Sequence, residues 1–265
     1  MSFVKFEHIT SGYGKGNVIE DITFEIEKGE LVGILGINGS GKSTLVKAIC
    51  NVLPHEGKVT VNNITLEEQT VKDAARMISY IPQKSGVSLD IPVIDVVLMG
   101  FNPWLSILEK PGKEMEEKAE EVLKQVGLED RIHENYMELS VGQKQLVIFA
   151  RALAREGVLL LMDEPESALD FSVRYRAMEI VRSWIKKGER AGLLILHDIS
   201  LALNCCDRLV LVNNRKVSDI IDLRRDTAES IEEKLQKIYG SLSLEKIRSK
   251  NGKERFVVLY DSEEI

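Results

Sequence analysis

The chain of 265 residues has little of what would tie it to a membrane interior, to an oxidising compartment or to nucleic acid. Its three cysteines, Cys50, Cys205 and Cys206, offer no metal-type spacing with histidine and are expected to be small buried side chains in a reducing compartment. No apolar stretch approaches the roughly 20 residues of a spanning helix, and the start lacks a signal-peptide core. Positive charge is not in excess, because the formal net charge is -7, which argues against nucleic acid as the main partner. We therefore expect a cytoplasmic protein. If it works at a membrane, another chain must supply the membrane-spanning segments.

What the chain does contain is an alternation of strand-type and helix-type segments. Residues 3–9 and 22–26 alternate apolar with polar side chains and indicate a small antiparallel layer. Helical patterns separate most of the later strand candidates, so the core should be a largely parallel sheet flanked by helices. The strand candidates are residues 30–35, 58–61, 77–81, 158–162, 193–196 and 208–212.

A predominantly helical block at residues 93–155 interrupts that alternation and indicates an inserted helical lobe. Beyond residue 223, a helix at 230–239 and two short strands predict a small tail. The predicted organisation is an α/β domain at 1–222, with a helical subdomain nested at about 84–157, and a C-terminal extension at 223–265.

Residues 36–44, GINGSGKST, match the phosphate-binding pattern GxxxxGK[ST]. The match lies between an apolar strand and a helical segment, which is the setting that the motif requires. Glycines let backbone N–H groups curl around phosphate oxygens, and the new helix adds its positive N-terminal end. Lys42 would reach the β- and γ-phosphates, and the Ser43 hydroxyl would ligate Mg²⁺. The segment therefore predicts a nucleoside triphosphate site formed by Gly36, Asn38, Gly39, Ser40, Gly41, Lys42, Ser43 and Thr44.

A second candidate site is the pair of acids that ends the apolar strand 158–162. Asp163 suits the Mg²⁺ shell, and Glu164 could polarise the water that attacks the γ-phosphate. His197 follows another apolar strand, and a lone histidine there is more often structural. It becomes a candidate because its strand should lie beside the strand that carries Glu164.

Several further motifs, in their order along the chain, resemble those of the nucleotide-binding subunit of ABC transporters. Residues 139–143, LSVGQ, resemble the signature sequence, and residues 165–170, PESALD, resemble the D-loop region. Gln83 matches the Q-loop position, His197 the switch histidine, and Tyr13 the aromatic residue that stacks on adenine.

The resemblance covers residues 1–222 and implies a P-loop ATPase fold of ABC type, with a mostly parallel sheet, an antiparallel β subdomain and an inserted helical subdomain. The cofactors that it implies are ATP and Mg²⁺. It implies catalytic roles for Glu164, His197 and Gln83, metal contacts from Ser43, Gln83 and Asp163, and nucleotide contacts from Tyr13, Ser140, Gly142, Gln143 and Asp170.

The same resemblance implies a head-to-tail dimer, in which the phosphate loop of one copy faces residues 140–143 of the other. ATP would then join the two halves, and hydrolysis would release them. Ser140 could instead be an ordinary N-cap, and both roles can hold together. Two departures stand out, Val141 where the family usually has glycine and Glu166 where threonine is common. Both are expected to be tolerated, with some effect on dimer affinity or rate.

Residues 96–104, residues 110–112 and the tail segment 237–240 resemble importers of iron–siderophore, haem and cobalamin complexes, although generic lobe and tail sequence would also explain them. The resemblance implies a peripheral ATPase on the inner face of the cell membrane, with a multi-span permease and, indirectly, a substrate-binding protein. The alternatives are another cargo, such as molybdate, another ion or an exported lipid, and a non-transport ABC protein acting in cluster assembly, on nucleic acid or on ribosomes.

Overall fold

The computed structural model describes residues 2–14, 16–84, 86–106, 108–155, 157–250 and 252–260. Its central element is a six-stranded sheet in the order β10-β9-β3-β8-β7-β6. The strands are β3 (Leu31–Leu35), β6 (Ile78–Ile81), β7 (Leu159–Asp163), β8 (Ala191–Ile195), β9 (Arg208–Asn213) and β10 (Lys216–Asp222). All neighbours pair in parallel except β10, which pairs antiparallel with β9. The predicted parallel α/β core is confirmed.

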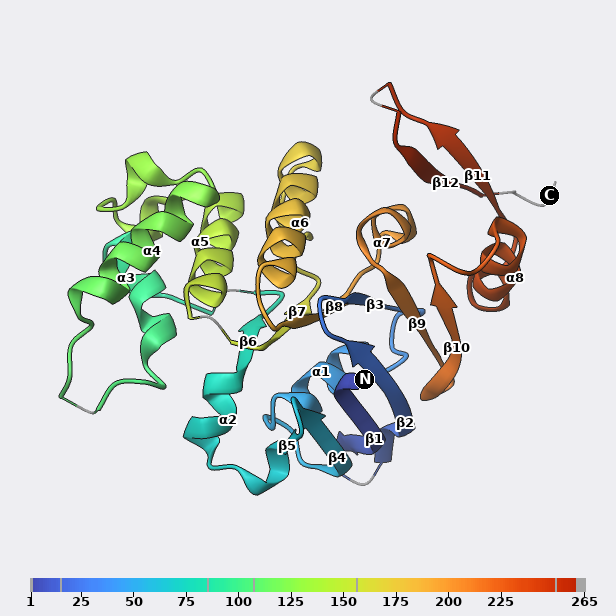
Figure 1. Ribbon diagram of the computed structural model, residues 1–265, viewed down its shortest axis with the longest axis horizontal. Coiled ribbons are helices and arrows are strands. Elements are labelled where there is room, and N and C mark those ends of the chain that lie inside the picture. The colour runs from blue at the N-terminus through green and yellow to red at the C-terminus, as the bar shows by residue number, and fades with distance from the viewer. Residues whose placement is uncertain are drawn as a thin grey trace.

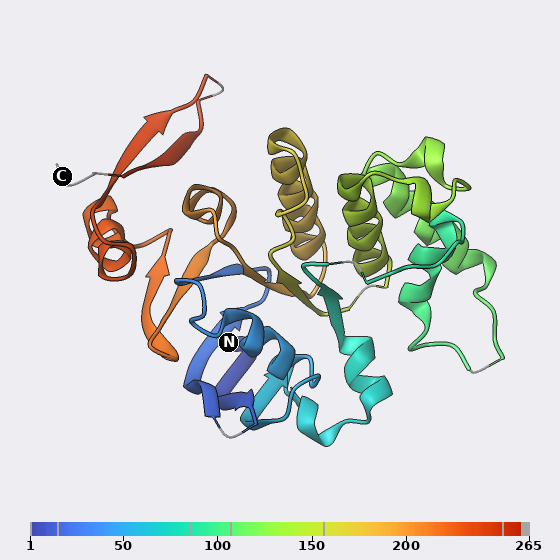
Figure 2. The ribbon, with the colours of Figure 1, turned by 180° about the vertical axis from the view of Figure 1, so that it is seen from behind.

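Both faces of this sheet are covered, which explains why its strands are nearly continuous apolar runs. In β7, Leu160 and Met162 face one hydrophobic core, whereas Leu159 and Leu161 face the other. The first core contains side chains of α5 (Val141–Ala154), α6 (Phe171–Lys186) and α7 (Ile199–Cys205). The second contains side chains of α1 (Lys42–Ile49) and of the antiparallel sheet. Figures 1 and 2 show these two layers on opposite sides of the central strands.

The antiparallel sheet has the strand order β2-β1-β4-β5. Its strands are β1 (Ser2–Tyr13), β2 (Gly16–Glu27), β4 (His55–Val61) and β5 (Ile64–Thr65). Residues 58–61, one of the strand candidates, lie in β4 and pair with β1. The alternation in β1 and β2 therefore reflects a sheet with one face toward the core.

The expected helical lobe lies at one end of the molecule in both ribbon views. The chain reaches it through η1 (Leu66–Glu68) and α2 (Val71–Met77), which precede β6. The lobe consists of α3 (Val93–Leu98), η2 (Met99–Phe101), α4 (Lys113–Gln125), η3 (Glu129–Arg131), η4 (Tyr136–Glu138) and α5. Among the described residues, none of the helices has the length and hydropathy that crossing a bilayer requires.

The C-terminal segment lies at the opposite end (Figures 1 and 2) and comprises α8 (Ala228–Tyr239) and the hairpin of β11 (Leu242–Arg248) and β12 (Glu254–Tyr260). Asn204 of α7 holds the edge of β12: its Nδ2 donates to the Phe256 carbonyl at 2.9 Å, and its Oδ1 accepts the Phe256 N–H at 3.1 Å. Lys237 of α8 pairs with Asp219 of β10 at 2.9 Å. The extension therefore packs onto the α/β core. The sequence did not predict β10, because its side chains are mostly half-exposed and of mixed polarity.

Candidate nucleotide site

The segment between β3 and α1 turns tightly, and its glycines are required by that geometry. Gly39 and Gly41 have φ of 80° and 100°, in the left-handed region that favours glycine. A Cβ at Gly36 would lie 2.3 Å from the Val212 carbonyl oxygen of β9, so the backbones approach too closely for any side chain. These constraints form the loop that precedes the α1 N-terminus.

Lys42 is 5% exposed, and the loop itself holds its ammonium group. Nζ donates to the carbonyl oxygens of Gly36 at 2.8 Å and Ile37 at 3.0 Å. Burial lowers the pKa of Lys42, while the carboxylates of Glu164 and Asp163 oppose that shift. The fold therefore places the Lys42 cation beneath the glycine loop and near the carboxylates of Asp163 and Glu164.

Ser43 and Asp163, both predicted metal contacts, lie side by side at the carboxyl edge of the sheet. The Ser43 hydroxyl donates to Asp163 Oδ1 at 3.0 Å. Burial raises the pKa of Asp163, the Ser43 hydrogen bond opposes that shift, and the nearby Glu164 adds to it. A hydroxyl and a carboxylate are hard oxygen donors of the kind that Mg²⁺ prefers, so the residues fit this metal.

Gln83, Glu164 and His197 follow β6, β7 and β8, and the structure brings the three side chains together. Gln83 Nε2 donates to Glu164 Oε2, and His197 Nε2 contacts Glu164 Oε1. Because neighbouring parallel strands end at the same sheet edge, residues far apart in the chain converge there. Glu164 has a φ of 48°, an unusual backbone conformation for a non-glycine residue that is often found at functional sites.

A cleft of about 190 Å³ lies between the phosphate loop and the side chains of Glu164 and His197. Its lining comprises Val18, Asn38, Gly39, Gly41, Lys42, Ser43, Thr44, Glu164 and His197. Tyr13 is exposed nearby, and its hydroxyl lies 3.5 Å from Lys47 Nζ on α1. The phosphate loop and the candidate water-activating acid therefore share one cavity.

The signature segment lies at the start of α5, in a separate pocket. Ser140 Oγ accepts the Gln143 N–H at 3.3 Å, and Gln143 Oε1 accepts the Ser140 N–H at 2.9 Å. The N-cap role considered for Ser140 is confirmed, as a capping box. The pocket of about 320 Å³ at this helix start is lined by Gln83, Lys84, Val141, Lys144, Gln145, Ser167 and Ala168. Gly142 lies close to the D-loop, since a Cβ there would be 3.2 Å from the Ala168 carbonyl oxygen, and Asp170 begins α6 as its N-cap residue.

One residue beside the phosphate loop comes from the C-terminal segment. The sequence did not predict that it lies there. The Tyr239 side chain lies near the backbone N–H of Gly36. Burial raises the pKa of Tyr239 to about 12, and the nearby Gly36 N–H opposes the shift. No local pattern could have indicated this proximity, because the two residues are about 200 positions apart.

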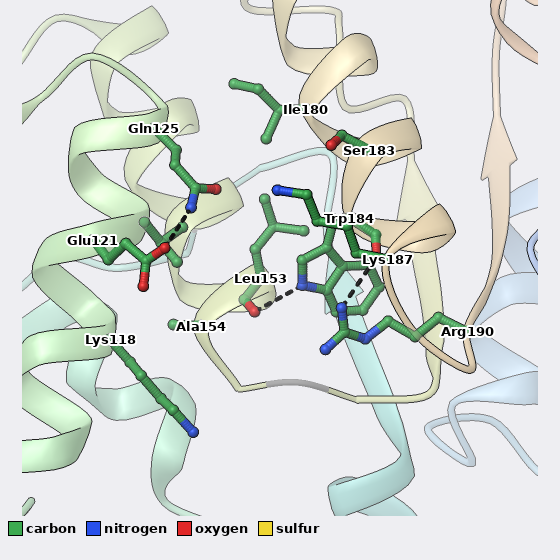
Figure 3. Close-up of a pocket in the computed structure, with 11 residues that line it drawn as sticks. Lys118, Glu121, Gln125, Leu153, Ala154, Ile180, Ser183, Trp184, Lys187 and Arg190 are labelled. Atoms are coloured by element: carbon green, nitrogen blue, oxygen red, sulfur yellow. Dashed lines mark hydrogen bonds between the residues drawn. The ribbon is translucent and has the colours of Figure 1, made fainter.

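A larger cavity of about 400 Å³ lies between α4, α5 and α6, with none of the predicted site residues in its lining (Figure 3). The Trp184 indole N–H donates to the Leu153 carbonyl at 3.1 Å, and the Arg190 guanidinium lies over the indole ring at 4.1 Å. The cavity lies toward the C-terminal ends of α5 and α6, whereas Ser140 and Asp170 are at their N-terminal ends. It is thus a feature of the junction between lobe and core, separate from the nucleotide cleft.

A glycine loop, a buried lysine and an acid at the end of another strand of the same sheet define a P-loop nucleoside triphosphatase. The comparisons with known proteins narrow the class. The sequence model of the family described as "ABC transporter" matches residues 19–167. The chain is 34% identical over 239 residues to the manganese transport system ATP-binding protein MntB of Bacillus subtilis, covering 89% of this chain and 92% of that protein. It is 33% identical over 240 residues to the zinc transport system ATP-binding protein TroB of Treponema pallidum, covering 89% and 86%.

Solved structures of ABC transporter proteins have the same fold. A transporter described as of metal-chelate type, in an inward-facing conformation, superposes with a TM-score of 0.80 at 24% identity and 98% coverage of both chains, which shows the shared fold. A dimeric ATP-binding cassette in a post-hydrolysis state, bound to ADP and Pi, superposes with a TM-score of 0.74 at 26% identity, covering 84% of this chain and all of that one. The chain belongs to the ABC transporter family. It is the ATP-binding subunit of such a transporter and an ATPase.

Proposed function

We propose that this chain hydrolyses MgATP with Glu164 as the group that polarises the attacking water. Lys42 binds the phosphates, and Ser43 and Asp163, with Gln83, would hold Mg²⁺, which would neutralise charge on the transferred phosphoryl group. The observation that carries the proposal is the contact of Glu164 with both Gln83 and His197 beside the phosphate loop. His197 and Gln83 orient the carboxylate, and Gln83 links it to the metal.

The working unit that we propose is a head-to-tail homodimer with ATP between the copies. Apolar side chains are exposed on the segments that such a dimer would bring together, namely Tyr13, Ile37, Val141 and Phe171. The N-terminus of α5, with Ser140 and Gly142, offers backbone N–H groups and a positive helix end to a γ-phosphate supplied by the other copy. Gln143, Tyr13 and Asp170 complete the nucleotide contacts.

We further propose that the dimer drives import of a transition-metal cargo and lies on the inner face of the cell membrane against a multi-span permease. The relatives named for manganese and zinc transport support Mn²⁺ or Zn²⁺ as cargo, ahead of the iron–siderophore complex expected from the sequence. A metal chelate is the second candidate, because the likeness to the metal-chelate type transporter extends over the C-terminal segment. A substrate-binding protein would deliver either cargo.

The hydrolysis proposal is tested by Glu164→Gln, which keeps the side-chain shape but removes the carboxylate. We expect MgATP binding to persist and turnover to fall roughly 10²–10⁴-fold, the usual contribution of a positioned base. Glu117→Gln, at an exposed glutamate of α4, is the matched control. Lys42→Ala should instead abolish MgATP binding in calorimetric titration. Near-normal turnover of Glu164→Gln would remove Glu164 from this role.

The cargo proposal is tested with the permease that co-purifies with this chain from gently solubilised membranes. Vesicles containing the complex would be assayed for ATP-driven accumulation of Mn²⁺, Zn²⁺ and a ferric siderophore, with a Glu164→Gln complex as control. Accumulation of one of the two ions supports the proposal. Accumulation of the siderophore alone would favour the chelate, and capture of soluble partners only would contradict transport.

A further inference from the structure

A cleft of about 600 Å³ lies between α6, α7 and the C-terminal hairpin, and none of the predicted site residues lines it. In both ribbon views α7 lies between α6 and the hairpin, and it packs against both α6 and β12 (Figures 1 and 2). The cleft is larger than the nucleotide cleft and than the cavity between α4, α5 and α6. Its volume is within the range of about 300–1,000 Å³ that is typical of small-molecule sites.

Positive charge is concentrated around this cleft, although the chain carries a formal net charge of -7. Five of the lining side chains are cationic and one is acidic. They are Arg182, Lys186, Lys187, Lys253, Arg255 and Glu179. Like charges around one concave surface repel one another and create a positive potential there, which attracts anions.

The protein itself holds the two arginines of the cleft in place. Arg182 pairs with Asp207 Oδ1 at 3.1 Å and donates to the Cys205 carbonyl at 2.9 Å. Arg255 donates from Nη1 to the Asn204 carbonyl at 3.2 Å. A guanidinium group has five N–H donors, so Arg255 keeps others with which to bind a ligand.

The three lysines are exposed, and within the described part of the chain none of their ammonium groups has an ion-pair or hydrogen-bond partner. Lys186 and Lys187 lie at the C-terminal end of α6, where the helix dipole favours cations, so α6 alone explains their charge. That explanation does not extend to Lys253 and Arg255, because they belong to the hairpin on the other side of the cleft. The convergence of cations from two separate elements therefore indicates a shared anionic ligand.

We propose that this cleft is an anion site, which binds a small compound with several phosphate groups and thereby joins the C-terminal hairpin to α6. Guanidinium groups bind phosphate oxygens through paired N–H donors, and lysine ammonium groups add point charges on flexible stems. A ligand with several phosphates matches a cleft with cations on two sides better than a single phosphate does. The site is separate from the nucleotide cleft, so the proposal does not rest on the roles proposed for Lys42 and Glu164.

The test is a calorimetric titration of the full-length chain with inorganic tripolyphosphate, without Mg²⁺. All variants carry Lys42→Ala, so that the phosphate loop lacks its lysine in each of them. We expect one site per chain, with an affinity that falls as salt is added. Lys186→Gln and Lys253→Gln should each weaken binding about threefold or more, and the two together about tenfold or more.

The control for the double variant is Lys124→Gln with Lys216→Gln, which removes the same charge outside the cleft. Lys124 is in the last turn of α4, as Lys186 is in the last turn of α6, and Lys216 is beside a turn between two strands, as Lys253 is. The control should bind tripolyphosphate within about twofold of the Lys42→Ala chain. All four lysines are exposed, and thermal unfolding checks that each variant is folded.

Three results would overturn the proposal. Absence of binding removes the site, and equal weakening in the control shows that only net charge matters. An unchanged affinity in Lys253→Gln shows that the hairpin does not contribute. Since all comparisons share the Lys42→Ala background, none of these results bears on the proposed hydrolysis, which Glu164→Gln tests separately.

A phospholipid headgroup carries the same phosphate chemistry, so flotation with phosphatidylglycerol vesicles is measured for the same variants. We expect no flotation that depends on Lys186 and Lys253, because a cleft suits a small soluble anion better than a flat membrane surface does. Flotation that is lost in the double variant, without binding of tripolyphosphate, would overturn the soluble ligand in favour of a lipid.

Discussion

Gly36 is the position at which a single added carbon should disturb the nucleotide site most. In Gly36→Ala the new Cβ would lie 2.3 Å from the Val212 carbonyl oxygen and 2.8 Å from Ser40 Oγ. Carbon and oxygen atoms approach to about 3.3 Å at closest in ordinary packing. The backbone of the loop must therefore move by about 1 Å, because the obstructing oxygen belongs to β9, which is paired on both sides within the sheet.

That movement should affect both stability and nucleotide binding. Overpacking of this kind costs about 1–3 kcal/mol of folding free energy. The Gly36 carbonyl also accepts from Lys42 Nζ, so a displaced loop moves the lysine that is proposed to bind the phosphates. A misplacement of about 1 Å in such a site can reduce activity by about 10²-fold.

The assay is MgATP titration by calorimetry together with thermal unfolding. Gly16→Ala is the matched control, because a Cβ at Gly16 would meet nothing within 4 Å and its φ is not in the left-handed region. We expect the control to bind MgATP like the wild type and Gly36→Ala to bind at least about tenfold more weakly. Equal affinity and equal unfolding temperature in the two variants would refute the steric argument.

Three further outcomes follow from particular contacts. Tyr239→Phe removes the hydroxyl that lies near the Gly36 N–H and should cost about 0.5–1.5 kcal/mol in chemical denaturation, with a severalfold rise in the KM for ATP. An unchanged denaturation midpoint would show that the hydroxyl contributes nothing. Trp184→Phe loses the hydrogen bond to the Leu153 carbonyl and should lower stability by about 1 kcal/mol while the ATPase rate of the folded protein stays normal. Burial raises the pKa of Cys205 to about 11, so its thiolate fraction at pH 8 is on the order of 10⁻³. Mass spectrometry should find that thiol alkylated by iodoacetamide only after unfolding.

The sequence predicted much of the nucleotide site because the information is local. A strand, a glycine loop and a helix follow one another within residues 30–49, and hydrogen bonding and φ angles inside that window determine the turn. The acids at 163 and 164 and the histidine at 197 could be placed at one sheet edge because parallel strands share their carboxyl ends. The other strands of the central sheet, the helical lobe and the tail helix were predictable from periodicity for the same reason, whereas β10 was not.

The details of the site could not be predicted, because they depend on which side chains meet across the fold. The contact of Glu164 with both Gln83 and His197 needs the neighbouring order of β6, β7 and β8.

The sequence by itself determined the chemistry of this protein: a phosphate loop with Lys42 and Ser43, an acid pair at a strand end, and the order of strands and helices. Those features arise from backbone conformation and from side-chain periodicity over short windows. Only the tertiary structure decided that Tyr239 lies near the loop, that Gln83 and His197 both contact Glu164 and that α4, α5 and α6 leave a cavity between them. Contacts of that kind depend on long-range packing, for which a single sequence carries no local signal.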